Sequence, residues 1–166
     1  MRRLFQNLSI AALLVAANAS VAQAEEQVTN EEFGATITMP TGWEQVEGNE
    51  RALFNFRDAA TFSQIEVIRA ELVTAEVASV FFDTFHETLV GSEFVESGRQ
   101  EATYGELAGT QTLYTFEHAG VSLNVTVFQF TRDTVAWLVI GYMQQSVADQ
   151  QTPVFASVVE SLSFGS

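Results

Sequence analysis

Alternation of apolar and polar residues predicts that the ordered part of the chain begins with a β-strand over residues 33–39. Its apolar residues are separated by threonines, which is the period-two pattern of a strand with one buried face. Pro40 and Gly42 end this strand, because proline cannot donate to a ladder and glycine readily adopts turn conformations. Residues 25–31 are polar and have no period, so we expect a flexible segment there.

Further strands follow on both sides of a central helical segment. The segment 135–143 is apolar at almost every position, which is typical of a central strand covered on both faces. His118 to Gly120 separate two strands and predict a hairpin turn. Besides these, extended structure is expected at Trp43 and over residues 52–57, 62–72, 93–100, 107–117 and 121–131.

Residues 74–90 change to the period of an amphipathic helix. Thr74 provides an N-cap and Gly91 a stop, so both ends of the helix are marked in the sequence. Phe82 falls outside the expected apolar stripe, which consists of Val77, Phe81, Phe85 and Leu89. A last helical segment is expected over residues 146–163, with Pro153 in a first turn and a buried stripe at Phe155, Val158, Val159 and Leu162.

The order of these elements predicts the fold class. Three strands, a helix, a run of antiparallel strands and a final helix indicate an α+β fold. We expect an antiparallel sheet of about six to seven strands with a helix on each face. The lengths fit a single domain over residues 32–166.

The first 24 residues have the pattern of a secretory signal peptide. Arg2 and Arg3 precede the apolar run Ile10–Ala17, and small residues at Ala22 and Ala24 fit a signal peptidase site. We therefore expect cleavage after Ala24 and a secreted or periplasmic protein. No second apolar run has the length of a membrane span, so none is expected after cleavage.

The composition excludes several kinds of function. All 21 acidic residues follow residue 24, where five arginines are the only basic side chains apart from histidine. Such a surface repels nucleic acids and anionic membranes. It fits either a cationic partner or divalent cations, or simply solubility, including solubility in a salty habitat. The chain has no cysteine, which excludes disulfides, thiolate metal sites, a thiol nucleophile and an acylated cysteine anchor.

The strongest candidate for metal chemistry lies on the central helix. Asp83, His86 and Glu87 have the i, i+3, i+4 spacing that places side chains on one face, where they are candidate ligands of a divalent cation. The alternative is an ordinary solvated helix face. The serines lack a nucleophile motif, so we expect neither catalysis nor a cofactor.

Aromatic side chains provide the candidates for a contact site. Trp43, Phe82 and Tyr142 are candidate residues of a contact patch. Phe81 and Phe85, together with Trp43, are candidates for the lining of an apolar cleft. The alternative for the whole set is an ordinary aromatic core.

Three segments resemble the PsbP/DcrB-like superfamily. They are Ile37–Trp43, with the sequence ITMPTGW, Gly105–Gly109, which leads into a strand, and the ending Phe155–Phe164. The resemblance implies an α/β/α sandwich that serves as an adaptor and has no shared catalytic site. It departs from the basic photosystem members, because this chain has no lysine.

Together these observations predict a secreted, monomeric accessory or adaptor protein of the periplasm that acts through contact with a protein partner. The alternative is a small periplasmic binding protein for an apolar ligand or a divalent cation. The residues identify neither the partner nor the ligand.

Overall fold

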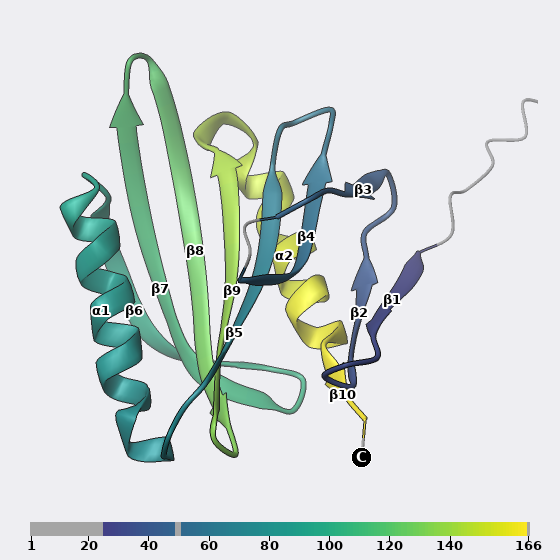
Figure 1. Ribbon diagram of the computed structural model, residues 1–166. Coiled ribbons are helices and arrows are strands. Elements are labelled where there is room, and N and C mark those ends of the chain that lie inside the picture. Colours follow the sequence, from purple (N-terminus) through teal and green to yellow (C-terminus); the bar gives the residue numbers. More distant parts are fainter. Residues whose placement is uncertain (1–24, 49–50, 166) are drawn as a thin grey trace, which may run out of the picture.

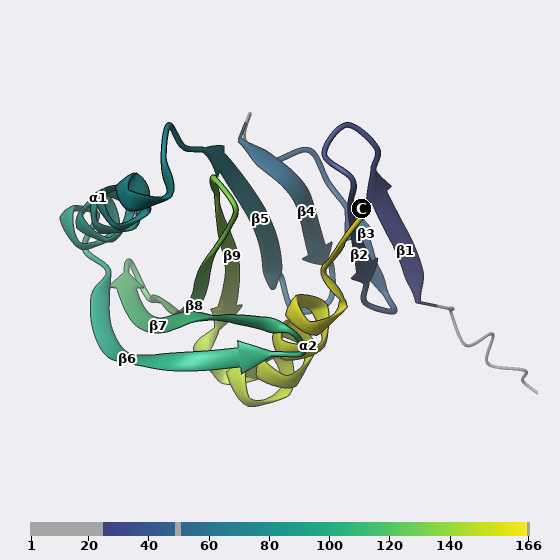
Figure 2. The same ribbon diagram turned by 90° about the horizontal axis from the view of Figure 1, so that it is seen from below.

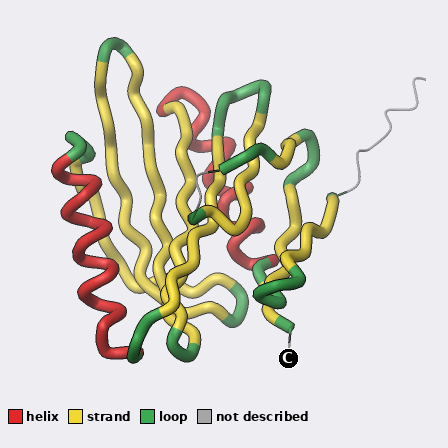
Figure 3. Tube along the Cα trace, viewed as in Figure 1, coloured by secondary structure: helices red, strands yellow, loops and turns green. Residues whose placement is uncertain are grey.

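The computed structural model describes residues 25–48 and 51–165, and strands make up most of this part of the chain (Figures 1 and 3). Seven strands form one antiparallel sheet. In spatial order they are β3 (Trp43–Gln45), β4 (Ala52–Asp58), β5 (Gln64–Glu71), β9 (Val135–Gln144), β8 (Val121–Arg132), β7 (Leu107–His118) and β6 (Val95–Tyr104). A smaller antiparallel sheet consists of β1 (Glu26–Asn30), β2 (Ala35–Met39) and β10 (Ser163–Phe164).

Two helices lie on opposite faces of the large sheet (Figure 2). A 3-10 turn, η1 (Ala75–Val77), leads into α1 (Ala78–Gly91), and a second, η2 (Gln145–Val147), leads into α2 (Ala148–Ser161). No helix in the described part of the chain is long and apolar enough to cross a membrane.

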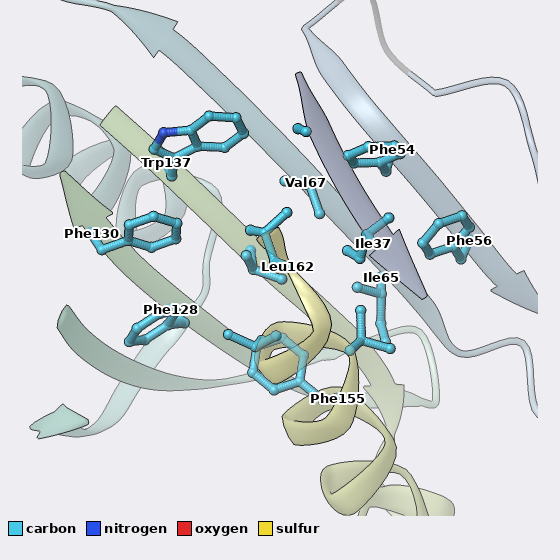
Figure 4. Close-up of a cluster of buried hydrophobic side chains, with 14 of the residues drawn as sticks. Ile37, Phe54, Phe56, Ile65, Val67, Phe128, Phe130, Trp137, Phe155 and Leu162 are labelled. Atoms are coloured by element: carbon cyan, nitrogen blue, oxygen red, sulfur yellow. The ribbon is translucent and has the colours of Figure 1, made fainter. Parts of the chain in front are cut away.

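The alternation of side chains along β9 separates two hydrophobic cores. Trp137, Val139 and Met143 belong to the core beneath α2, which also contains Phe155 (Figure 4). Ala136, Leu138 and Ile140 face the other way and pack in the core beneath α1. Because successive residues of a strand point to opposite faces, a strand that is apolar throughout is buried on both sides. This confirms the predicted antiparallel sheet with a helix on each face.

Glycines permit a tight hairpin turn in the large sheet and the close packing of α2 against it. The hairpin between β7 and β8 turns at Ala119 and Gly120, which have φ values of 51° and 82°. Positive φ at both central residues is the geometry of the tightest hairpins. At Gly141 a Cβ atom would lie 2.7 Å from the ring of Phe155, so α2 packs directly against the backbone of β9.

Three predicted features differ from the structure. Residues 26–30, expected to be flexible, form β1, in which Val28 pairs with Ile37 of β2 and packs against the core. Backbone pairing orders this segment, and the polarity of its side chains gives no sign of it. Residues 163–164 leave the expected helix and pair with β2, and Pro153 lies inside α2 rather than in its first turn.

The buried stripe of α1 also differs from the prediction. Its buried residues are Ala78, Phe82 and Leu89, whereas Val77 and Val80 are exposed. An α-helix has 3.6 residues per turn, so a stripe that repeats strictly every four residues rotates around the helix. Residues that are alternately four and three positions apart stay on one face of a helix. The residues of α1 that pack on the sheet follow this spacing.

Candidate functional site

An open apolar groove of about 830 Å³ lies between α1 and the neighbouring strands β5 and β9. It arises because α1 packs over β7, β8 and β9 and leaves the adjoining face of β5 only partly covered. Its lining residues come from four parts of the chain: Arg51, Ile68, Arg69, Ala70, Phe81, Thr84, Phe85, Thr88 and Leu138.

The wall that α1 contributes to the groove is apolar despite its two threonines. The hydroxyl of Thr84 donates to the carbonyl of Val80 at 2.7 Å, and that of Thr88 donates to the carbonyl of Thr84 at 2.8 Å. Their hydrogen atoms are therefore directed into the helix itself. Together with the half-buried rings of Phe81 and Phe85, the methyl groups leave a surface suited to apolar contact.

Charge is sparse in the groove. Of the described residues that line it, only two arginines carry a charge. The guanidinium of Arg69 lies 3.7 Å from the centre of the Phe33 ring, on the α2 side of the sheet, so its charge is directed away from the groove. The second charge is that of Arg51, directly before β4. Arginine stays protonated throughout the physiological range, so neither side chain serves as a general base.

Polar residues continue the same face of the sheet beyond the groove. Asn55 and Glu66 are opposite each other in the register of β4 and β5, and both are buried. Gln64 donates to the side-chain oxygen of Asn55 at 2.8 Å. Burial, and secondly the charge of Glu66, raise the pKa of Tyr142 to about 12. This tyrosine therefore remains a neutral phenol at physiological pH.

The predicted metal ligands do not converge. Asp83 and Glu87 are exposed, whereas His86 turns towards β6 and β7. Its Nδ1 atom lies 2.8 Å from the hydroxyl of Tyr114 and 3.1 Å from the guanidinium of Arg99. Within residues 25–48 and 51–165, no group of three or more histidine and carboxylate side chains is arranged to hold a metal ion.

The predicted contact residues are also separated. Trp43 is buried in the core beneath α2, while Phe82 and Tyr142 belong to the core beneath α1, on the other side of the sheet. Phe82 is only 9% exposed, so it is a core residue rather than part of a patch. Of the three residues proposed for an apolar cleft, Phe81 and Phe85 line the groove and Trp43 does not.

Sequence reasoning missed the sheet side of the groove. Ile68, Ala70 and Leu138 form its floor, and each lies in a strand that the sequence did predict. Their alternate spacing places them on one face. Nothing in the sequence indicates that the helix covers β7 and β8 and leaves β5 open, because this depends on the order of the strands.

Comparison with known proteins supports the fold. No family model matches the chain, and no curated protein matches it. Among solved structures, one from Bacteroides thetaiotaomicron is 11% identical with a TM-score of 0.63. That match covers 87% of this chain and 49% of the other, so this chain spans about half the length of that structure.

Two further structures have lengths closer to that of this chain. Cyanobacterial PsbP from Synechocystis is 13% identical with a TM-score of 0.60, and the match covers 92% of this chain and 99% of that one. LpqN of Mycobacterium tuberculosis, described as involved in cell envelope biogenesis, is 14% identical with a TM-score of 0.55. The match covers 86% of this chain and 91% of LpqN. The chain has an α+β fold like that of cyanobacterial PsbP, which is the fold that the resemblance of its three motifs implied.

Proposed function

We propose that this protein is a secreted accessory protein of the periplasm that binds an apolar segment of a partner protein in the groove between α1 and β5, without catalysis. The groove carries this proposal, since it presents half-buried aromatic rings and few polar groups to solvent. Contiguous exposed apolar surface of this kind is typical of interaction sites. The predicted signal peptide and the envelope role described for LpqN support the location.

The apolar surface extends beyond the groove, which favours a protein partner. Val77 and Val80 are 39% and 63% exposed, and each lies one helical turn before a groove residue, Phe81 and Thr84 respectively. Val73, just before η1, is 93% exposed. A small molecule confined to the groove would leave these valines uncovered, whereas a protein segment lying along α1 would cover them.

The charges on the helix indicate what flanks that segment. Glu76, Asp83 and Glu87 are exposed carboxylates along η1 and α1. Opposite charges at the edge of an interface guide its formation and select partners. The three are seven and four residues apart, which places them on one side of the helix. We therefore expect basic residues on the side of the partner's apolar segment that faces them.

A small apolar ligand is a second candidate, and the volume of the groove favours it. Sites for small molecules are typically about 300–1,000 Å³, and the groove lies within this range. Arg51 is among the lining residues, and its positive charge favours a ligand with an anionic end.

Photo-crosslinking in the periplasm tests the proposal. A photoreactive amino acid at position 88 lies in the groove, and one at the exposed position 106, in the turn between β6 and β7, serves as the control. We expect position 88 to capture a defined protein that position 106 does not capture, and Phe85→Asp to abolish the capture. No adduct at position 88, or equal adducts at both positions, would contradict the proposal that a protein partner binds in the groove. Native mass spectrometry that shows a small molecule released on denaturation would instead establish the second candidate.

A further inference from the structure

A second cavity lies on the other face of the large sheet from the groove. Its volume is about 400 Å³, and its lining residues come mainly from β5, β9, β10, the turn between β1 and β2, and the turn between β8 and β9. Figure 1 shows β10 and these two turns at the same end of the molecule. Arg69, Trp137 and Arg132 line it, together with the rings of Phe33 and Phe164. Arg69 lines both cavities, but its guanidinium lies on this side of the sheet, over the ring of Phe33. The cavity therefore does not depend on the function proposed above.

Arg69 contributes a buried hydrogen-bond donor to this cavity. Its guanidinium lies over the ring of Phe33 and donates to Glu71 at 3.0 Å, and only 15% of the side chain is exposed. Its Nε atom is buried and has no acceptor among the residues that the structure describes. A buried N–H group without a hydrogen-bond acceptor lowers the stability of the folded protein. A ligand that supplies the acceptor would therefore bind favourably here.

Trp137 contributes a second such donor beside the first. It is the cross-strand neighbour of Arg69 in the pairing of β5 with β9, which places their Cβ atoms about 5 Å apart. The indole is 4% exposed and packs against Phe130 and Phe164. Its Nε1 atom also lacks an acceptor within the described residues. Figure 4 shows this nitrogen on the edge of the ring that is turned away from the other labelled side chains.

The charges around the cavity are arranged by depth. Arg132 lies over the ring of Phe164 at 4.5 Å, so two of the five arginines that follow residue 24 lie at this one site. Three carboxylates also line it, Glu32, Glu71 and Asp133, and all three are exposed, as is Arg132. The buried part therefore offers the N–H donors of Arg69 and Trp137, while the exposed rim carries three carboxylates and one arginine.

We propose that this cavity binds a small zwitterion, a molecule that carries one carboxylate and one cationic nitrogen. The two oxygens of the carboxylate accept from Trp137 Nε1 and Arg69 Nε, with Arg132 nearby. The cationic nitrogen lies towards Glu32 and Asp133 at the entrance. These carboxylates disfavour phosphate and other multiply charged anions, since like charges repel. Amino acids and betaines share this chemistry.

The indole N–H signals in nuclear magnetic resonance spectra of the mature protein provide the test. The chain has two tryptophans, and the Trp137→Phe variant assigns the signal of Trp137 by its disappearance. Glycine and glycine betaine are titrated separately at constant ionic strength, with acetate and choline as the half-molecules. We expect one of the zwitterions to shift the Trp137 signal saturably, and acetate to bind roughly tenfold more weakly because it lacks the cationic group.

A matched pair of variants locates the binding. Arg132→Gln removes the charge at the cavity and should weaken the zwitterion about tenfold. Arg57→Gln removes an exposed arginine that pairs with Glu44 elsewhere on the sheet, so it should leave binding unchanged. The absence of a saturable shift with either zwitterion would overturn the proposal. Equal binding of acetate, or equal weakening by the two variants, would also overturn it.

Discussion

Close packing at single residues decides which substitutions this fold tolerates. Gly141 is the clearest case, because a side chain there would have to occupy space already filled by α2. A hypothetical Cβ atom lies 2.7 Å from Phe155 and 2.9 Å from Met143. Both neighbours are buried and have little room to move. The residue is thus fixed by packing, although its backbone conformation is open to any amino acid.

We predict that Gly141→Ala lowers the free energy of unfolding by about 1–3 kcal/mol through overpacking. Urea denaturation of the mature protein measures this loss. Gly91→Ala is the control, since a Cβ atom at position 91 meets no other atom within 4 Å. An unchanged stability of Gly141→Ala would show that α2 moves away from β9 at little cost.

The ionisation of Tyr142 gives a second prediction at this scale. Burial and the charge of Glu66 raise its pKa to about 12 from the ordinary value of 10.0. The folded state holds this proton more tightly than the unfolded chain. The associated stability is therefore complete below pH 10 and is lost as the pH rises from 10 towards 12.

Ultraviolet titration of the phenols measures this pKa directly. Glu66→Gln should lower the pKa of Tyr142 and leave it above 10, because burial remains. Tyr142→Phe identifies which of the three tyrosines is responsible. A pKa that does not respond to Glu66→Gln would mean that burial alone causes the shift.

At the scale of whole elements, periodicity identified most strands and both helices, but not which surfaces they cover. The segment 135–143 was recognised as a central strand because both of its faces are apolar. Strand β1 was missed because its residues are polar and are ordered by pairing with β2. The groove depends on the spatial order of strands that are distant in sequence, so Phe81 and Phe85 were found while Ile68 and Leu138 were not.

The two faces of α1 lead to a prediction that separates core from groove. Phe82→Ala should lower the free energy of unfolding by about 3–5 kcal/mol, because this ring is buried in the core beneath α1. Phe85→Ala should cost clearly less, since that ring is half-exposed in the groove, yet it should weaken the crosslink from position 88. Denaturation and crosslinking are measured on both variants. If Phe85→Ala were the more destabilising variant, Phe85 rather than Phe82 would be the core residue of α1, as the sequence alone predicted.

For the whole molecule, the dominant feature is its excess of acidic residues. Few of them are neutralised: the ion pairs that arginines form among the described residues include Arg57–Glu44, Arg69–Glu71 and Arg99–Glu96. Most carboxylates are exposed on a compact body, where they repel one another more strongly than in an extended chain. This repulsion between carboxylates destabilises the folded protein whether the acidic surface serves solubility or attracts a basic partner.

Salt therefore should stabilise the protein. Raising the ionic strength from 0.01 to 0.15 M shortens the screening length from about 30 Å to about 8 Å, which weakens the repulsion between distant carboxylates. We predict that the melting temperature of the mature protein rises over this range. A triple variant, Glu87→Gln, Glu106→Gln and Glu117→Gln, removes three exposed charges and should show a smaller rise, because it begins with less repulsion. Thermal melting at several sodium chloride concentrations compares the two proteins. Equal slopes would indicate that salt acts through the hydrophobic cores rather than through the charges, since the variant leaves those cores unchanged.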